Sequence, residues 1–376
     1  MKKLYLATTL IAAVLASYGQ GISLPPSGGN QKASVTQWIG PVSVSISYSS
    51  PGVHGGPNNA DRTGHIWGEL VPYGLTNLGF GTATEAPWRA GANENTTFSV
   101  SHDVRINGKE LKAGTYGLHI IVEKDKPWTI IFSKNSTSWG SFFYDVSEDA
   151  LRVEATPMEH AFTEYLTYGF DNRTGSSSEA FLSWENKRLA WKIEVANVND
   201  IYLASIRNEL KNSPGFNYLN WVSAAQFCAT NKINLEEALT WADNAISAPF
   251  IGQETFQTLQ TKANVLTAMG KDAEASAIMD KAIQHQTANV GQVHQYARTL
   301  VAAGKKEKAM EVFKLNSKLH PEDKFTTSVG LARGYTAMGD KKNAVKYWEI
   351  ALANLPENQK ANLSFYQGEL KKVKEM

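Results

Sequence analysis

The stretch "WRAGANENTTFSVSHDV", residues 88–104, gathers an arginine, two asparagines, a glutamate and a histidine around a single glycine. A guanidinium, an amide and a carboxylate beside a flexible Gly-Ala step can offer several directional contacts to one ligand. We therefore expect a polar ligand site formed by Trp88, Arg89, Asn93, Glu94 and Thr96. The alternative is a loop that enters a strand, in which Arg89 pairs with Glu94 and the asparagines cap turn amides.

A catalytic version of this site would be a hydrolase. Glu94 is then the candidate general acid or base, and His102 or His119 would assist it. His102 continues the alternation of Phe98 and Val100, which predicts that its ring points into the core. His119 is expected on the opposite face from its apolar strand neighbours, so the two histidines share a ligand only if neighbouring strands bring them together.

Complete catalytic signatures are missing from the sequence. It contains no G-x-S-x-G nucleophile elbow, no phosphate-binding loop and no dinucleotide fingerprint. No two histidines have the HExxH or HxH spacing of a metal site. We therefore expect no metal and no cofactor, and the sequence leaves open whether the protein is an enzyme.

The elements that must position these residues show a hydrophobic period of two over residues 33–197. It is clearest in "VSVSISY", "FSVSHDVRI", "TYGLHIIV" and "LAWKIEV", and shorter candidates are "WTIIFS", "ALRVEA", "EYLTYGF" and "AFLSWE". Such alternation is typical of strands with one buried face. The pair Asn107-Gly108 predicts a tight hairpin turn, whereas the polar "NNADRTGH", residues 58–65, is expected to be an exposed loop. About nine short strands without helices between them predict an antiparallel β-sandwich or jelly roll.

Helical periodicity replaces this pattern near residue 198. "DIYLASIRNELKN" predicts a helix with Asp200 as its N-cap, which "SPG" at 213–215 ends. Beyond it, Gly270, Gly304 and Gly339 recur 34 and 35 residues apart. Small and large residues keep the same register, namely Ala263, Ala297 and Ala332, then Ala275, Ala309 and Ala344, then Met279, Phe313 and Trp348.

This arrangement resembles the tetratricopeptide repeat, whose period is about 34 residues. Pro321 and Pro356 stand where that repeat breaks its second helix, and "NLEEALTWADNAI", residues 234–246, fits the second helix of an earlier unit. The resemblance implies stacked helix pairs over residues 219–372, joined to the strand domain by a linker helix and turn at 198–218. It also implies a surface that binds a protein or peptide.

The strand domain resembles a family known as domain of unknown function 2911. The resemblance rests on "YSSPGVHG", "ELVPYG", "PWRAGANENTTF", "KELKAGTYGLHII", "WTIIFS" and "WGSFFYD", which follow in the order of that family. The family is common in exported proteins of Bacteroidetes-type bacteria and brings no established activity, so it favours a functional site at residues 88–96 without naming a reaction. Two features depart from its pattern: Ser50-Pro51 replaces an arginine-proline pair, and "LTNLGFGTATEA" separates the VPYG and WR elements.

The N-terminus has the layout of a secretory signal peptide, with Lys2 and Lys3 before an apolar run at 4–15 and small residues after it. We expect a signal peptide at residues 1–19 and a flexible leader at 20–32. The apolar run is shorter than the roughly 20 residues of a membrane span, so no span is expected after signal removal.

Composition narrows the class of protein further. Cys228 is the only cysteine, which excludes an internal disulfide. The 37 basic and 36 acidic residues give a net charge of +1, so no general field attracts nucleic acid. The sequence thus predicts a periplasmic or secreted α+β protein with segregated domains, which acts as a binding or scaffold protein. Its partners would be a protein or peptide on the repeats and a small polar ligand on the sandwich; the alternative is a periplasmic hydrolase of a polymer or peptide.

Overall fold

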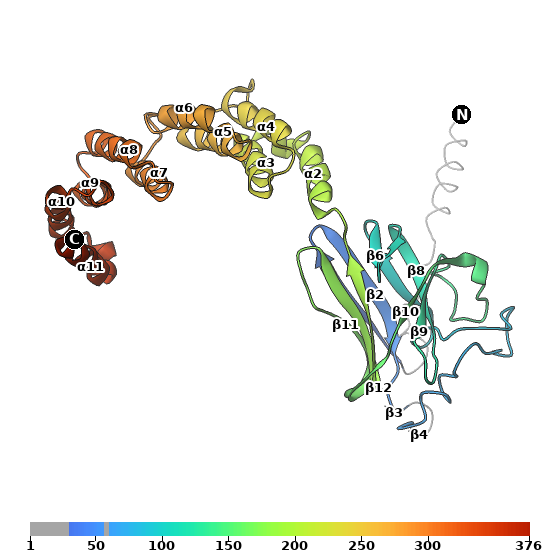
Figure 1. Cartoon of the computed structure of the whole chain (residues 1–376). Helices are drawn as coiled ribbons and strands as arrows, with labels where there is room; N and C mark the ends of the chain where they lie inside the picture. Colours follow the sequence, from blue (N-terminus) through green and yellow to red (C-terminus); the bar gives the residue numbers. More distant parts are fainter. Residues whose placement is uncertain (1–29, 56–59) are drawn as a thin grey trace, which may run out of the picture. The chain divides into compact units, whose positions relative to one another are not determined.

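The computed structural model describes residues 30–55 and 60–376. The predicted signal peptide and residues 20–29 of the predicted leader lie outside the described residues. The chain divides into two compact units between Leu203 and Ala204. Strands fill the first and helices the second (Figure 1), so the predicted segregation of the two kinds of element is confirmed.

The described part of the strand-rich unit contains three antiparallel sheets. The largest has the order β1-β2-β5-β8-β9-β10, the second has the order β11-β12-β6-β7, and the third is the short pair β3-β4. The strands are β1 (Gln31–Ile39), β2 (Val42–Ser50), β3 (His54–Gly55), β4 (Ala60–Asp61), β5 (Thr96–Val100), β6 (Val104–Ile106), β7 (Lys109–Leu111), β8 (Gly114–Ile121), β9 (Trp128–Ser133), β10 (Asp149–Ala155), β11 (Met158–Asp171) and β12 (Ser177–Glu194). Strand β1 begins inside the predicted leader, two residues before the expected start of the domain at residue 33.

A single core lies between the two larger sheets, as a sandwich requires. In β2 the buried residues Val44 and Ile46 alternate with half-buried serines, as the period of two predicts. Across the sheets, the Tyr48 ring of β2 meets the Tyr168 ring of β11 edge to face, with centroids 4.8 Å apart. The inner faces of both sheets thus share one apolar cluster, which stabilises the unit by removing apolar surface from water.

Two turns show how the sequence controls the path of the strands. The predicted hairpin turn joins β6 to β7, with φ of 45° at Asn107 and 82° at Gly108, and both angles are those of a tight primed turn. The segments "AFLSWE" and "LAWKIEV", expected as separate strands, instead form the one long strand β12. Glu185, with φ of 52°, lies at a register shift opposite Thr163, so a bulge absorbs the polar interruption while the pairing with β11 continues.

Ten α-helices follow in the described chain, among them four pairs that pack as neighbours: α3 with α4, α5 with α6, α7 with α8, and α9 with α10 (Figure 1). Their bounds are α2 (Val198–Glu209), α3 (Tyr218–Asn231), α4 (Leu235–Ser247), α5 (Phe256–Ala268), α6 (Asp272–Ala282), α7 (Val290–Ala302), α8 (Lys306–Leu319), α9 (Lys324–Met338), α10 (Lys341–Ala353) and α11 (Leu363–Glu375). This pairing is the one that the tetratricopeptide-like period predicts.

The repeat frame read from the sequence is confirmed by the turns and by the packing. Gly270, Gly304 and Gly339 lie between the paired helices with φ of 77°, 76° and 76°, a conformation that glycine adopts without strain. The alanines and the large residues of the frame are all buried: Ala263, Ala297, Ala332, Ala275, Ala309, Ala344, Met279, Phe313 and Trp348. Small residues thus let helices approach closely, and large ones fill the space between pairs.

The linker helix α2 differs from its prediction at its first turn. It begins at Val198, so Asp200 lies in the first turn and is not the N-cap. A carboxylate in the first turn is favoured because it faces the positive end of the helix dipole. "SPG" follows as part of the 3-10 helix η4 (Ser213–Phe216), which separates α2 from α3.

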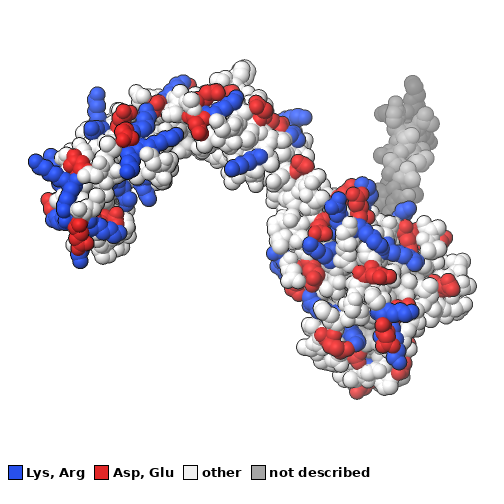
Figure 2. All heavy atoms as spheres, viewed as in Figure 1, with Lys and Arg blue, Asp and Glu red and all other residues white. Residues whose placement is uncertain are grey.

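The strand-rich unit carries surface charges of both signs (Figure 2). Figure 2 shows basic and acidic side chains interspersed on its visible face, as the near-zero net charge suggests. None of the helices in the described ranges is both long and apolar enough to cross a bilayer.

Candidate functional site

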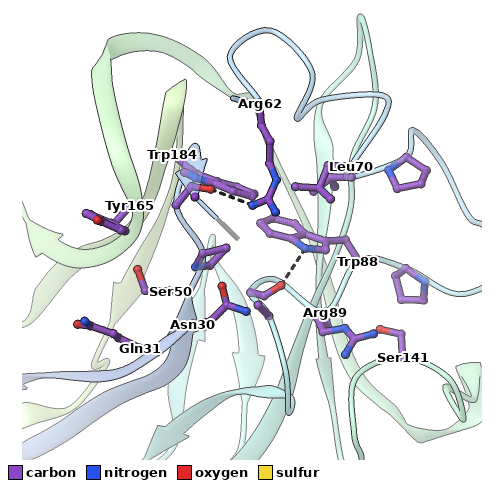
Figure 3. Close-up of a pocket in the computed structure, with 18 of the residues that line it drawn as sticks. Asn30, Gln31, Ser50, Arg62, Leu70, Trp88, Arg89, Ser141, Tyr165 and Trp184 are labelled. Carbon is purple, nitrogen blue, oxygen red and sulfur yellow. Dashed lines mark hydrogen bonds between the residues drawn. The ribbon is translucent and has the colours of Figure 1, made fainter. Parts of the chain in front are cut away.

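A cavity of about 790 Å³ opens in the strand-rich unit. Its walls come from the start of β1, the end of β2, the loops at 70–78 and 86–92, and single residues of more distant segments, of which Arg62, Ser141, Tyr165 and Trp184 are labelled in Figure 3. Its volume is within the range of roughly 300–1,000 Å³ that is typical of small-molecule sites. Trp88 and Arg89 of the predicted site line this cavity.

Tryptophans form one side of the cavity. Trp88 and Trp184 stack with ring centroids 6.2 Å apart and an interplanar angle of 17°, and Trp67 meets both rings edge-on. The Trp88 Nε1–H donates to the carbonyl of Gly91 at 3.2 Å, which fixes the orientation of the indole. Because Trp88 is only half-buried, part of its ring surface remains available to a ligand.

Positive groups dominate the charge of the lining. The Arg62 Nη1–H donates to the Gly52 carbonyl at 3.3 Å. The Arg89 Nη1–H donates to the Asn93 carbonyl at 2.6 Å, and its guanidinium lies 5.0 Å from the centre of the Phe142 ring. Burial lowers the pKa of Arg89 below its usual value. No aspartate or glutamate of the described chain lines the cavity.

Lys32 and His54, which also line the cavity, each pair with acidic side chains. Lys32 Nζ lies 2.5 Å from Glu94 Oε1. His54 Nδ1 lies 2.7 Å from Glu164 Oε2, and its Nε2 lies 3.3 Å from Asp61 Oδ1. The hydrogen bond with Glu164 raises the pKa of His54.

The expected ion pair between Arg89 and Glu94 does not form. Glu94 pairs with Lys32 of β1, and its Oε2 accepts a hydrogen bond from Ser49 at 3.3 Å. The hydrogen bond from Lys32 is the main cause that holds the pKa of Glu94 below its ordinary range. The loop turns at Ala90 and Asn93, both with positive φ, and this path carries the Glu94 side chain toward β1 and away from Arg89.

Asn93, Glu94 and Thr96 are not among the residues that line the cavity. Asn93 Oδ1 accepts a hydrogen bond from the side chain of Asn30 at 3.2 Å. Thr96 is buried, and its hydroxyl donates to the Ala90 carbonyl at 3.0 Å. These residues shape the loop that presents Trp88 and Arg89 at the cavity wall.

The two histidines of the catalytic alternative are placed apart from Glu94. His102 is exposed and contacts Ser101 Oγ at 2.9 Å, so the prediction that it points into the core is wrong. Strand β5 ends at Val100, and the alternation does not continue through the bend beyond it. Glu94 precedes the opposite end of the same strand, so the strand separates Glu94 from His102.

His119 lies on the opposite face of β8 from Leu118 and Ile120, as predicted, but it is buried at 2% exposure. Its Nδ1 is 2.9 Å from Ser141 Oγ, and its ring meets that of Tyr144 edge to face. Burial and the nearby charge of Arg89 lower the pKa of His119 to about 4, so the imidazole is neutral at pH 7. It does not line the cavity.

Several cavity residues were missed at the sequence level, notably Arg62, Trp184 and His54. Arg62 belongs to the polar stretch that was expected to be an exposed loop, and Trp184 to a predicted strand. A signal was nevertheless available: the segments at 48–55, 69–74 and 87–98 that carry the family resemblance all contribute to the cavity wall. Within the described ranges, no three His, Cys, Asp or Glu side chains are grouped so that they could hold a metal ion.

The structure therefore defines a two-unit protein in which a strand-rich domain with a small-molecule-sized cavity precedes helix pairs of the tetratricopeptide type. Residues 30–193 match the model of the family described as protein of unknown function, DUF2911. The chain thus contains a DUF2911 domain, as its motifs suggested. A search of the curated proteins found no match.

Solved structures resemble the helical part. One is YrrB, described as a tetratricopeptide repeat protein with an unusual peptide-binding site; it is 15% identical, with a TM-score of 0.30 over 45% of this chain and 84% of YrrB. Another is a tetratricopeptide repeat protein from Parabacteroides merdae, 15% identical, with a TM-score of 0.31 over 47% of this chain and 72% of that one.

Proposed function

We propose that this chain is an exported binding protein, in which the strand-rich domain holds a small polar ligand and the helical repeats bind a protein or peptide. The observation that carries the proposal is the cavity of about 790 Å³, walled by Trp88 and Trp184 and by the guanidinium groups of Arg62 and Arg89. An apolar ring surface beside a few directional polar donors is the usual composition of a ligand site.

The helical unit contributes a second, extended surface. Stacked helix pairs leave a continuous face that is formed by one helix of each pair, and repeat proteins use such faces to bind other chains. Export rests on the N-terminal pattern of the sequence alone. Together these features suit a protein that works outside the cytoplasm and connects a small ligand with a protein partner.

A hydrolase centred on Glu94 has less support. Glu94 is bound by Lys32 and Ser49, and its lowered pKa opposes a role as a general acid near neutral pH. The binding proposal therefore predicts that Glu94→Gln leaves function intact.

The test is ligand-dependent thermal stabilisation of the full mature chain. A panel of sugars, amino acids and small organic acids is screened for compounds that raise the unfolding temperature of the strand-rich unit. A ligand at 100 times its Kd adds about 2.7 kcal/mol to the free energy of unfolding. Trp88→Ala should abolish this stabilisation, whereas Trp38→Ala, which removes an exposed tryptophan outside the cavity, should retain it.

Circular dichroism of each variant shows whether it is folded, and Glu94→Gln provides a third comparison. Equal stabilisation of the wild type and of a folded Trp88→Ala protein would contradict the assignment of the cavity as the binding site. Breakdown of a bound compound by the wild type, lost in Glu94→Gln protein that still binds it, would favour the hydrolase instead.

A further inference from the structure

Two cations of the cavity have no anionic partner within the described residues. Arg62 and Arg89 each make one hydrogen bond to a backbone carbonyl, and neither forms an ion pair with a described carboxylate, whereas some other arginines of the strand-rich unit do form such pairs. Arg152 and Arg188, for example, are paired with Asp149 and Asp171. In Figure 3 Arg62 lies above the Trp88 ring and Arg89 below it.

Arg89 is packed closely by its neighbours although no described carboxylate pairs with it. Its guanidinium packs on the backbone of Gly140, where an added Cβ would come within 2.2 Å of Cζ, and on the Phe142 ring. It is therefore held in place and partly removed from water. A desolvated charge is unfavourable unless an opposite charge compensates it, and a guanidinium has five N–H donors of which one bond is accounted for here.

The apolar part of the lining indicates what kind of molecule would carry the anion. Trp88 offers ring surface, and Leu70, Pro72 and Pro87 add apolar walls. The cavity is much larger than an inorganic ion needs. Resting on the proposed binding function, we infer that the cavity takes an organic oxyanion, a carboxylate or phosphate carried on a ring-shaped body, with the anion at the guanidinium groups that line the cavity and the ring against Trp88.

The guanidinium groups account for the anion in this assignment, and the indole ring accounts for the ring of the ligand. The planar guanidinium fork matches the two oxygens of a carboxylate or phosphate and binds them more strongly than it binds neutral acceptors. A flat aromatic ring or the apolar face of a sugar ring can pack on the indole. A neutral sugar could accept hydrogen bonds from the guanidinium groups but would leave their positive charge uncompensated.

Matched acid and neutral compounds test the inference by calorimetry on the full mature chain. The pairs are benzoate with benzamide, glucuronate with glucose, and phenyl phosphate with phenol, and acetate and inorganic phosphate serve as anions without a ring. We expect at least one ring-bearing acid to bind about ten- to a hundredfold more tightly than its neutral partner, as the loss of a charged hydrogen bond implies. The carboxylate and phosphate pairs identify which oxyanion is preferred.

Variants identify the groups responsible. Arg62→Gln should weaken binding of the acid by at least about tenfold and leave any binding of the neutral partner unchanged. Arg89→Lys, which keeps the charge but removes the fork, should weaken it as well. Arg105→Gln makes the same charge change on the exposed surface of β6 outside the cavity and should bind as the wild type does. Thermal unfolding confirms that each variant is folded, and Arg62→Gln, which removes one backbone hydrogen bond, is the variant to rely on if Arg89→Lys is unstable.

The outcomes separate this inference from the proposed function. Equal binding of acid and neutral compounds, or full affinity in folded Arg62→Gln protein, overturns the oxyanion while the cavity stands as a binding site. Failure of every ring-bearing acid to bind also overturns it, and the Trp88→Ala experiment then decides separately whether the cavity binds anything. Binding of acetate and inorganic phosphate as tightly as the ring-bearing acids shows an anion site without a role for the ring, which contradicts the inference too.

Discussion

At the scale of single residues, position within the strand-rich unit decides what a side chain can do. Arg89 and Glu94 are five residues apart in sequence, yet one faces the cavity and the other pairs with Lys32. The two histidines also differ in their surroundings. His102 is exposed to solvent, whereas His119 is buried beside Ser141. Burial lowers the pKa of His119 and so couples its protonation to the stability of the strand-rich unit.

We expect His119 to make the strand-rich unit sensitive to acid. Its pKa is about 4 in the folded state and about 6.5 when unfolded. Stability is therefore complete above pH 6.5 and falls as the pH drops toward 4, because only the unfolded state takes up the proton there. The full difference amounts to about 3 kcal/mol. His119→Gln should remove this part of the slope in urea unfolding measured from pH 7.5 to 4, and His102→Gln, a change at an exposed site, should keep it. A wild-type slope in His119→Gln protein would contradict the assignment.

At the scale of elements, strand pairing organises the strand-rich unit, whereas side-chain size at helix contacts organises the helical unit. Strand pairing with β11 keeps β12 continuous through the bulge at Glu185, although the local pattern breaks there. The helices depend on the size of the residues that face their partners, since Ala309 has no exposed surface and lies where α8 packs on its neighbours.

Ala309→Leu should overpack the contact of α8 and lower the free energy of unfolding of the helical unit by about 1–3 kcal/mol. Ala302→Leu makes the same substitution at an exposed position of α7 and should have little effect. Thermal or urea unfolding of both variants is the measurement. Equal stabilities of the two would mean that the repeat frame is displaced along the sequence.

At the scale of the whole molecule, the division between the units lies inside α2 and not before it. Val198 and Ile201, in the first turn and a half of this helix, pack on the core of the strand-rich unit, and Leu203 is 1% exposed. Arg207, near the end of the helix, pairs with Glu237 of α4. The helix therefore belongs in part to each unit.

We expect a fragment of residues 30–212 to be a stable strand-rich domain and a fragment of residues 30–197 to be clearly weaker. Removing the helix takes away the partly buried Val198 and Ile201 and the buried Leu203, and full burial of one such side chain contributes about 1.5–3 kcal/mol. Urea unfolding of the two fragments gives the difference directly. As a control, the variant Val198→Ala in the longer fragment should lose part of the same free energy. Equal stability of the two fragments would show that α2 is dispensable for the strand-rich unit.

The sequence by itself determined the kinds of element, their order and the repeat frame. Alternation in "VSVSISY", the Asn107-Gly108 turn and the recurring Gly270, Gly304 and Gly339 are local signals, and each reflects the backbone geometry of the few residues that carry it. It also drew attention to Trp88 and Arg89, which line the cavity, because a guanidinium, amides and a carboxylate lie together around one glycine there. The family motifs at 48–55 and 69–74 pointed to further parts of the cavity wall.

Only the tertiary structure decided which of these side chains meet. Loops have no repeating backbone geometry, so the direction of a loop side chain depends on contacts with distant segments. Lys32 draws Glu94 toward β1, the end of β5 leaves His102 exposed, and the packing of several loops brings Arg62 to the cavity that Trp88 and Arg89 also line. Because these contacts join residues tens of positions apart, no local pattern encodes them. The cavity, with two guanidinium groups that no described carboxylate pairs with, forms only when the chain is folded.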